Sequence, residues 1–232
     1  STAARESDGT LYVQAGPEIC VCSTKAYTAQ IVASALLALR LSLAKGQMDQ
    51  AEVERHFHDL EQLPGLIREV LKRDWQDQRA ASLFRNARSA LFLGRGVNST
   101  TAYEGALKLK EVSYLHAEAY PAGEMKHGPI ALLEPGFPVV AIVPADHVHD
   151  KTVSNIQEVI ARGATCIAVA TDGDEQVASL CEHVLWIPAA PDERLAPILA
   201  VVHLQLLARY VARARGCDVD KPRNLAKSVT VE

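Results

Sequence analysis

The spacing of apolar positions changes in a regular way along the second two-thirds of the chain. Continuous apolar runs, which are typical of strands buried on both faces of a parallel sheet, occupy residues 90–93, 138–143, 165–170 and 183–187. Segments with the apolar spacing of helices follow them at residues 98–115, 148–162, 175–180 and 195–215. This alternation predicts an α/β fold in which a parallel sheet carries helices on both faces.

The first part of the chain has a different pattern. Leu11–Ala15 is a short strand candidate, and helical spacing covers residues 28–44 and 50–73, with a break expected at Pro64-Gly65. One strand is too few to close a sheet. This part is therefore expected to be the end of one subdomain together with linking helices.

The domain organisation predicted from these patterns has three parts. Residues 1–74 are the C-terminal remnant of a first subdomain, residues 75–216 form a complete second subdomain, and residues 217–232 form a tail. The chain begins at Ser1 without an initiator Met, which agrees with a fragment or a processed product.

Composition narrows the class of protein. Of the 232 residues, 48% are hydrophobic and only 5% aromatic, which suits helices over a buried sheet in a globular protein. The net charge of -4 argues against a nucleic-acid partner. The five cysteines are scattered, which indicates small core residues in a reducing compartment. Neither a cleavable signal pattern nor an uninterrupted apolar run of membrane-spanning length is visible, so we expect a cytoplasmic location.

Polar residues gather on the helix expected after residue 98. Glu104, Lys108 and Glu111 are spaced by four and then three residues, so they project from one helix face. A carboxylate beside an amine can transfer protons, but it also forms ordinary intrahelical salt bridges, and spacing alone favours the salt bridge. An irregular loop at residues 116–129 follows. His127 in this loop is a candidate acid–base group or a plain surface histidine.

The turn Gly94-Arg95-Gly96 precedes the same helix. Glycines and the hydroxyl residues that follow them at a helix N-terminus can bind phosphate through backbone N–H groups. A glycine turn between strand and helix is more often simple geometry, and this one is not a complete dinucleotide motif.

The C-terminal segment Asp218–Glu232 is polar and has no apolar stripe of helical length. Pro222 fixes the backbone before Arg223, and Lys227 follows four residues later. Partial desolvation and a nearby Arg disfavour an ammonium ion, so such a Lys could form a Schiff base with a carbonyl substrate. A solvated tail lysine is the alternative, and the tail alone favours it. The apolar residues available to anchor the tail are Leu225, Ala226 and Val229.

Two histidine pairs are candidate metal ligands. His56-x-His58 and His147-x-His149 have a spacing that chelates metals on a strand, but both pairs fall in helical or loop context. No metal site is predicted from them.

Four sequence blocks, in the same order, resemble the isomerase (SIS, sugar isomerase) domain of glutamine:fructose-6-phosphate aminotransferases, or glucosamine-6-phosphate synthases. The blocks are Glu104–Glu111, His116–Tyr120, Gly123–Pro129 and Pro222–Glu232. The likeness extends to Arg5–Asp8 and Glu18–Ala26, so it covers nearly the whole chain.

This resemblance implies flavodoxin-like SIS subdomains that convert fructose 6-phosphate and glutamine-derived ammonia to glucosamine 6-phosphate. It implies that Glu111 is the base that moves a proton between C1 and C2 and that Lys227 forms the imine with the ketose. It implies that His127 helps to open the sugar ring and reaches the site of the neighbouring subunit in a homodimer. No metal or organic cofactor is implied. The substrate-binding residues implied are Val21, Ser23, Lys108, Arg223 and Ala226.

Two features of the family are missing from this sequence. The Ser/Thr-rich loops that hold the phosphate in the first subdomain do not occur, and neither does the glutaminase domain with its leading cysteine. We therefore expect a chain truncated inside the first subdomain that by itself binds fructose 6-phosphate weakly or not at all. The alternatives are a phosphosugar isomerase or deglycase without a glutaminase, and a non-catalytic sugar-phosphate-binding SIS protein.

Overall fold

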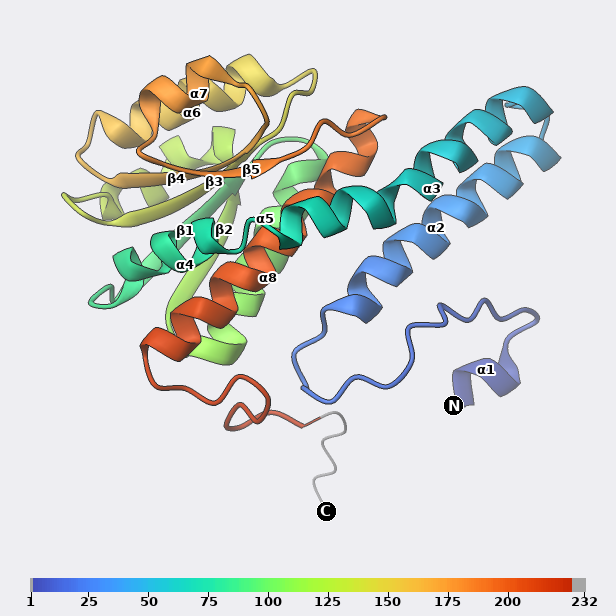
Figure 1. Cartoon of the computed structure of the whole chain (residues 1–232), viewed down its shortest axis with the longest axis horizontal. Helices are drawn as coiled ribbons and strands as arrows, with labels where there is room; N and C mark the ends of the chain where they lie inside the picture. Colours follow the sequence, from blue (N-terminus) through green and yellow to red (C-terminus); the bar gives the residue numbers. More distant parts are fainter. Residues whose placement is uncertain (1, 227–232) are drawn as a thin grey trace.

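The computed structural model describes residues 2–226, and a parallel sheet lies at its centre (Figure 1). The strand order is β2-β1-β3-β4-β5, and every neighbouring pair is parallel. This confirms the predicted α/β class. The strands are β1 (Ser89–Gly94), β2 (His116–Pro121), β3 (Pro138–Val143), β4 (Thr165–Thr171) and β5 (His183–Ile187).

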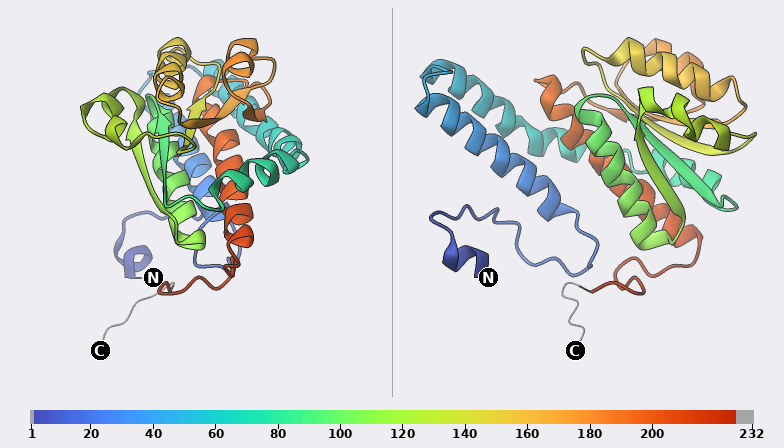
Figure 2. Two further views of the ribbon diagram at one scale, coloured as in Figure 1. Left: turned by 90° about the vertical axis from the view of Figure 1, so that its left-hand side faces the viewer. Right: turned by 180° about the vertical axis from the view of Figure 1, so that it is seen from behind.

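Helices cover both faces of this sheet, as Figure 2 shows from two further sides. On one face α5 packs beside α8, and on the other lie α6 and α7. The α-helices are α1 (Thr2–Glu6), α2 (Lys25–Ala44), α3 (Gln50–Leu71), α4 (Trp75–Ala81), α5 (Val97–Ser113), α6 (His149–Ile160), α7 (Glu175–Leu180) and α8 (Ala196–Ala214). The 3-10 helices are η1 (Ser82–Phe84), η2 (Ala122–His127), η3 (Pro129–Leu132) and η4 (Glu193–Leu195).

The core forms two apolar layers, one on each side of the sheet. All six residues of β3 are buried because the strand lies between neighbours and under helices on both faces. This is the burial that its unbroken apolar sequence predicts. Alternate residues of the strands face opposite layers: Val140 and Ile142 pack toward α5 and α8, whereas Val139 and Ala141 pack toward α6.

Helices α2 and α3 form an antiparallel pair that extends away from the sheet (Figure 1). A capping box begins α3: the Asp49 carboxylate accepts from the Glu52 N–H, and the Glu52 carboxylate accepts from the Asp49 N–H, both at 2.8 Å. The predicted break at Pro64-Gly65 is wrong, since α3 continues through both residues. Both residues lie on its exposed side.

Two further sequence predictions need correction. Leu11–Ala15 is not a strand, and Leu11 and Tyr12 are exposed. The segment at residues 116–129, expected as an irregular loop, begins with strand β2 and continues as η2. Strand β2 is an edge strand, and its Glu118 and terminal Pro121 hide the apolar pattern that identifies central strands.

Helix α2 and the helical segment Glu193–Ala214, which joins η4 to α8, are each long and apolar enough to cross a membrane by length and composition alone. In α8, 78% of the apolar window is buried inside the fold, as expected for the core helix of a globular domain. In α2 none of it is buried within the described part of the chain.

Candidate functional site

The last two turns of α5 hold a buried cation between two carboxylates. The Lys108 Nζ lies 2.7 Å from the Glu111 Oε2 and 3.4 Å from the Glu104 Oε1. Only 3% of the Lys108 side chain is exposed, against 11% for Glu104 and 20% for Glu111. The same-face spacing predicted these contacts, but their burial rules out the solvated salt bridge that the spacing favoured.

Burial and neighbouring charges shift the pKa values of Lys108 and Glu104. Burial alone would lower the pKa of Lys108, but the hydrogen-bonding contact with Glu111 and the negative charges of Glu104 and Glu111 outweigh it, so the pKa is raised. Burial also raises the pKa of Glu104, although Lys108 opposes the shift. Lys108 is therefore ammonium at neutral pH, with no lone pair for attack on a carbonyl. It can hold and balance the Glu111 carboxylate.

Residues 18–24, which are far from α5 in the sequence, form a covering segment over this cluster. The thiol of Cys22 is buried beside Lys108 and Glu111, and burial raises its pKa to about 12. This thiol therefore stays protonated at neutral pH and can donate to a carboxylate. The predicted contact residues Val21 and Ser23 flank Cys22 and are partly buried.

Glu18 fixes the path of that covering segment. Its carboxylate accepts from the backbone N–H of Thr24 at 2.8 Å and of Ala26 at 3.3 Å, where α2 begins. Farther along, the Cys20 Sγ donates to the backbone carbonyl of Val219 at 3.0 Å. The covering segment is thus tied both to its own helix and to the start of the C-terminal tail.

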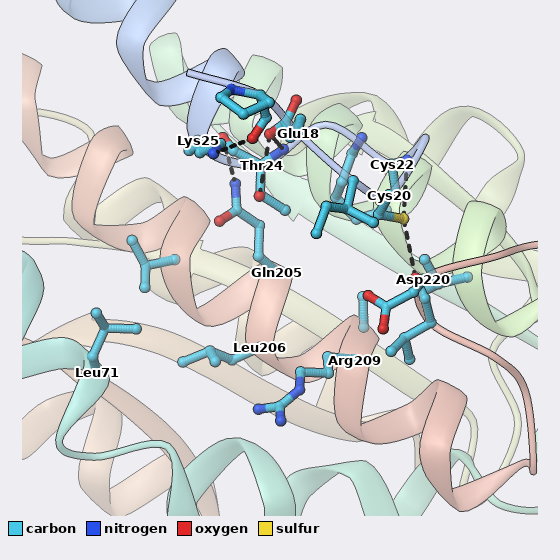
Figure 3. Close-up of a pocket in the computed structure, with 17 residues that line it drawn as sticks. Glu18, Cys20, Cys22, Thr24, Lys25, Leu71, Gln205, Leu206, Arg209 and Asp220 are labelled. Atoms are coloured by element: carbon cyan, nitrogen blue, oxygen red, sulfur yellow. Dashed lines mark hydrogen bonds between the residues drawn. The ribbon is translucent and has the colours of Figure 1, made fainter. Parts of the chain in front are cut away.

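A cavity of about 440 Å³ lies between the covering segment and α8 (Figure 3). Cys20, Cys22 and Lys108 line it on one side, and Gln205 and Arg209 line it from α8. Six predicted site residues within the described chain do not line it: Val21, Ser23, Glu111, His127, Arg223 and Ala226. The cavity therefore borders Lys108, the partner of Glu111, without including Glu111 itself.

The C-terminal tail reaches the end of α5. Tyr114 adopts a left-handed conformation there (φ 58°), its hydroxyl accepts from the Arg223 N–H at 2.7 Å, and the Arg223 guanidinium lies 4.2 Å from the centre of its ring. Pro222 is buried, whereas Leu225 and Ala226 are exposed. The predicted anchoring by Leu225 and Ala226 is therefore wrong, since Pro222 and Arg223 make these contacts. Lys227 and Val229 lie outside the described residues.

His127 and Glu111 lie at opposite ends of strand β2. It is exposed at the end of η2, which follows the carboxyl end of β2, whereas Glu111 lies in the part of α5 that leads to the amino end of β2. The neighbouring Lys126 fixes η2 against α6 through Glu158, at 2.7 Å. Within one chain, His127 and Glu111 do not share a site.

The glycine turn before α5 is a tight strand-to-helix connection. A Cβ on Gly94 would lie 2.2 Å from the Asn98 carbonyl oxygen, so a larger residue does not fit there. Beside this turn, the Asn98 side-chain amide donates to the Asp146 carboxylate at 2.7 Å. A carboxylate at this position disfavours the phosphate that the turn could otherwise bind.

Cys22 and Tyr114 contribute to this region, and the sequence does not identify either of them. Cys22 was counted only as a scattered core thiol, and nothing in its spacing relates it to Glu111, which is far along the chain. Tyr114 gave no signal because its role depends on the left-handed backbone at the end of α5.

Comparison with known proteins places these features in a family. The SIS domain model matches residues 83–215. The chain is 53% identical over 232 residues to the glutamine–fructose-6-phosphate aminotransferase (isomerizing) of Thermus thermophilus, covering 100% of this chain and 38% of that protein. It is 50% identical to the protein of the same name from Mycobacterium tuberculosis, covering 98% of this chain and 37% of that protein. The chain thus spans little more than a third of the length of these curated relatives.

Solved structures agree with this result. The C-terminal domain of glucosamine-fructose-6-phosphate aminotransferase from Francisella tularensis matches with a TM-score of 0.89 and 40% identity, covering 95% of this chain and 62% of that one. A glucosamine-6-phosphate deaminase from Thermotoga maritima matches with a TM-score of 0.71 and 24% identity, covering 100% of this chain and 64% of that one. The second match shows the shared fold alone.

Proposed function

Because the chain belongs to the SIS domain family, we propose that it is part of the isomerase region of a glutamine–fructose-6-phosphate aminotransferase, which makes glucosamine 6-phosphate from fructose 6-phosphate. The observation that carries this proposal is the 53% identity to such an enzyme along the entire chain. The buried Lys108–Glu111 pair supports it, since it supplies a fixed carboxylate next to the segment that holds Val21 and Ser23.

Glu111 is the proton-transfer base in this proposal. Isomerisation of a ketose imine needs one base that takes a proton from C1 and returns it to C2, and a carboxylate on a rigid helix reaches both carbons with little movement. Lys108 orients this carboxylate through the 2.7 Å contact. Cys22 adds a protonated donor on the other side.

Lys227 is the nucleophile in this proposal. Its neutral amine adds to C2 of the ketose, a C–N bond forms, and the carbonyl oxygen leaves as water. Ammonia then displaces the lysine from the imine carbon. Lys108 cannot take this role because its two carboxylate neighbours keep it protonated.

The remaining functions lie with other parts of the assembly. His127 opens the sugar ring in the site of a second subunit, which agrees with its distance along the sheet from Glu111 in its own chain. Arg223 and Ala226 position the tail beside the substrate, and a preceding SIS subdomain holds the phosphate. A glutamine-hydrolysing domain supplies ammonia. We place the enzyme in the cytoplasm as a homodimer, with residues 1–74, 75–216 and 217–232 as the three parts of this region.

The test uses the full polypeptide that carries this sequence, assayed for glucosamine 6-phosphate with fructose 6-phosphate and glutamine. Glu111→Gln keeps the size of the side chain but removes the base, so turnover should fall about 10²- to 10⁴-fold. Lys110→Gln, an exposed change next to it, is the matched control and should keep wild-type turnover. Wild-type turnover in Glu111→Gln would contradict the assigned role. Sugar-phosphate isomerisation without any use of glutamine would favour the phosphosugar isomerase alternative.

A further inference from the structure

Three metal-ligating side chains meet far from Glu111, where α3 passes the segment before α8. The His56 Nδ1 lies 3.8 Å from the Asp59 Oδ2, one turn along α3, and 3.8 Å from the Asp192 Oδ2. All three candidate ligand atoms lie within 4.8 Å of one another. Among residues 2–226, no other group of three His, Cys, Asp or Glu residues meets this distance limit.

The surroundings of this group hold its carboxylates in place. The Asp192 carboxylate accepts from the Arg194 guanidinium and from the Arg194 N–H, the latter at 2.8 Å. Metal-binding carboxylates are commonly oriented by such donors. The Asp192 Oδ2, which faces His56, accepts from the Arg194 Nε at 3.2 Å and from its Nη2, so a metal at this oxygen displaces the longer of these two contacts.

The group also borders open space. His56, Asp59, Asp192 and Arg194 line a cavity of about 310 Å³, whose other side is formed mainly by apolar residues of α2. The side chains of the three ligand residues are 17–27% exposed. A small ion can therefore reach them, and the partial burial strengthens its interaction with the carboxylates.

We propose that His56, Asp59 and Asp192 bind a zinc ion that ties α3 to the segment before α8. One imidazole nitrogen and two carboxylate oxygens are a donor set that zinc accepts, with a water at the fourth position. Bond lengths of about 2.0–2.2 Å place such ligand atoms about 3.3–3.6 Å apart. The 3.8 Å separations seen here need only a small contraction. The site joins residues on both sides of the boundary at residue 74.

Helix α3 contains a matched control. His58 lies two residues after His56 and has its own carboxylate at the same spacing, with 3.7 Å between the His58 Nδ1 and the Glu61 Oε2. This pair is exposed, and no distant carboxylate within residues 2–226 completes it. The comparison isolates the contribution of Asp192, because the local helix geometry is the same for both histidines.

Calorimetric titration of the full chain with zinc chloride tests the proposal. We expect one zinc ion per chain, bound at least about tenfold more weakly after His56→Gln or Asp59→Asn and unchanged after His58→Gln. Zinc at a hundredfold excess over its dissociation constant should raise the unfolding midpoint by about 5 °C in the wild type. Equal affinity of His56→Gln and the wild type would overturn the proposal, as would an equal loss in His58→Gln.

X-ray absorption of the zinc-loaded chain gives an independent answer, because the five cysteines are alternative zinc ligands. Nitrogen and oxygen ligands at about 2.0–2.1 Å support the His56 site. A sulfur shell near 2.3 Å would assign the ion to the cysteines and overturn the proposal. Neither result depends on the sugar-phosphate chemistry proposed for Glu111.

Discussion

Helices α2 and α8 have nearly the same length and are both rich in Ala and Leu, yet their surroundings differ completely. Twelve residues of α8 are buried, and none of α2 is. α8 packs against α5 and α4 over the sheet, whereas α2 packs mainly along α3. Composition therefore identifies both helices, and only the neighbouring elements decide how much free energy of folding each contributes.

The same contrast holds for polar groups. In the body of the fold, which is the sheet and the helices packed on it, His203 of α8 and Asp77 of α4 form a fully buried pair, with 2.8 Å between Nδ1 and Oδ2. In the α2–α3 pair, the comparable contact between His58 and Glu61 is open to water. Buried pairs are costly to break because they leave an uncompensated group behind, whereas exposed pairs contribute little.

The largest expected effect comes from breaking the buried pair. Asp77→Ala leaves His203 without its partner inside the core, so the free energy of unfolding should fall by about 3–5 kcal/mol. Glu61→Ala, the matching change in α3, should cost less than about 1 kcal/mol. Urea unfolding measures both. Similar losses in the two variants would show that the body and the helix pair do not differ as described.

Apolar truncation sharpens the contrast between the two helices themselves. Leu207→Ala removes a fully buried side chain of α8 and should cost about 2–5 kcal/mol. Leu37→Ala removes a side chain of α2 that is 51% exposed and should change the free energy of unfolding by less than about 0.5 kcal/mol. A loss above 2 kcal/mol for Leu37→Ala would mean that its exposed face is covered in solution.

Helix caps should contribute a larger share of the stability in the exposed α2–α3 pair than in the buried helices. Asp49→Ala removes half of the capping box of α3, which leaves backbone N–H groups of the first turn without an acceptor. The expected cost is about 1 kcal/mol. Circular dichroism during urea unfolding measures it. An Asp49→Ser variant keeps a side-chain acceptor and should recover most of the loss.

The smallest effect concerns pH at the contact between the helix pair and the body. Arg194 holds the pKa of Asp192 at about 2, below the value of about 3.9 in an unfolded chain. This contribution to stability is fully present above pH 4 and is lost as the pH falls toward 2. The stability difference between the wild type and Asp192→Asn should therefore shrink below pH 4, measured by thermal unfolding with a chelator present. A difference that stays constant would contradict the assignment.

Sequence predicted the body much better than the rest. The strands Pro138–Val143 and His183–Ile187 were placed at their exact ends because buried parallel strands have unbroken apolar runs. Strand β2 was missed because it lies at the sheet edge, and the apolar run at Leu11–Ala15 has no sheet to join.

The candidate site also has one part that the sequence predicts and one part that it does not. The Glu104, Lys108 and Glu111 cluster followed from helical spacing, since all three residues lie on one element. The contacts of Cys22 with this cluster, and of Asp192 with His56, join residues that are distant in sequence. Spacing carries no information on such contacts, and they emerge only when the helices pack.

The proposed mechanism requires different roles for two lysines: Lys108 is a fixed cation, and Lys227 is the nucleophile. Borohydride reduction of the full polypeptide with fructose 6-phosphate, followed by peptide mass spectrometry, tests this directly. We predict a reduced sugar-phosphate adduct on Lys227, which persists in Glu111→Gln because imine formation does not need that base. An adduct on Lys108 in place of Lys227 would contradict the account.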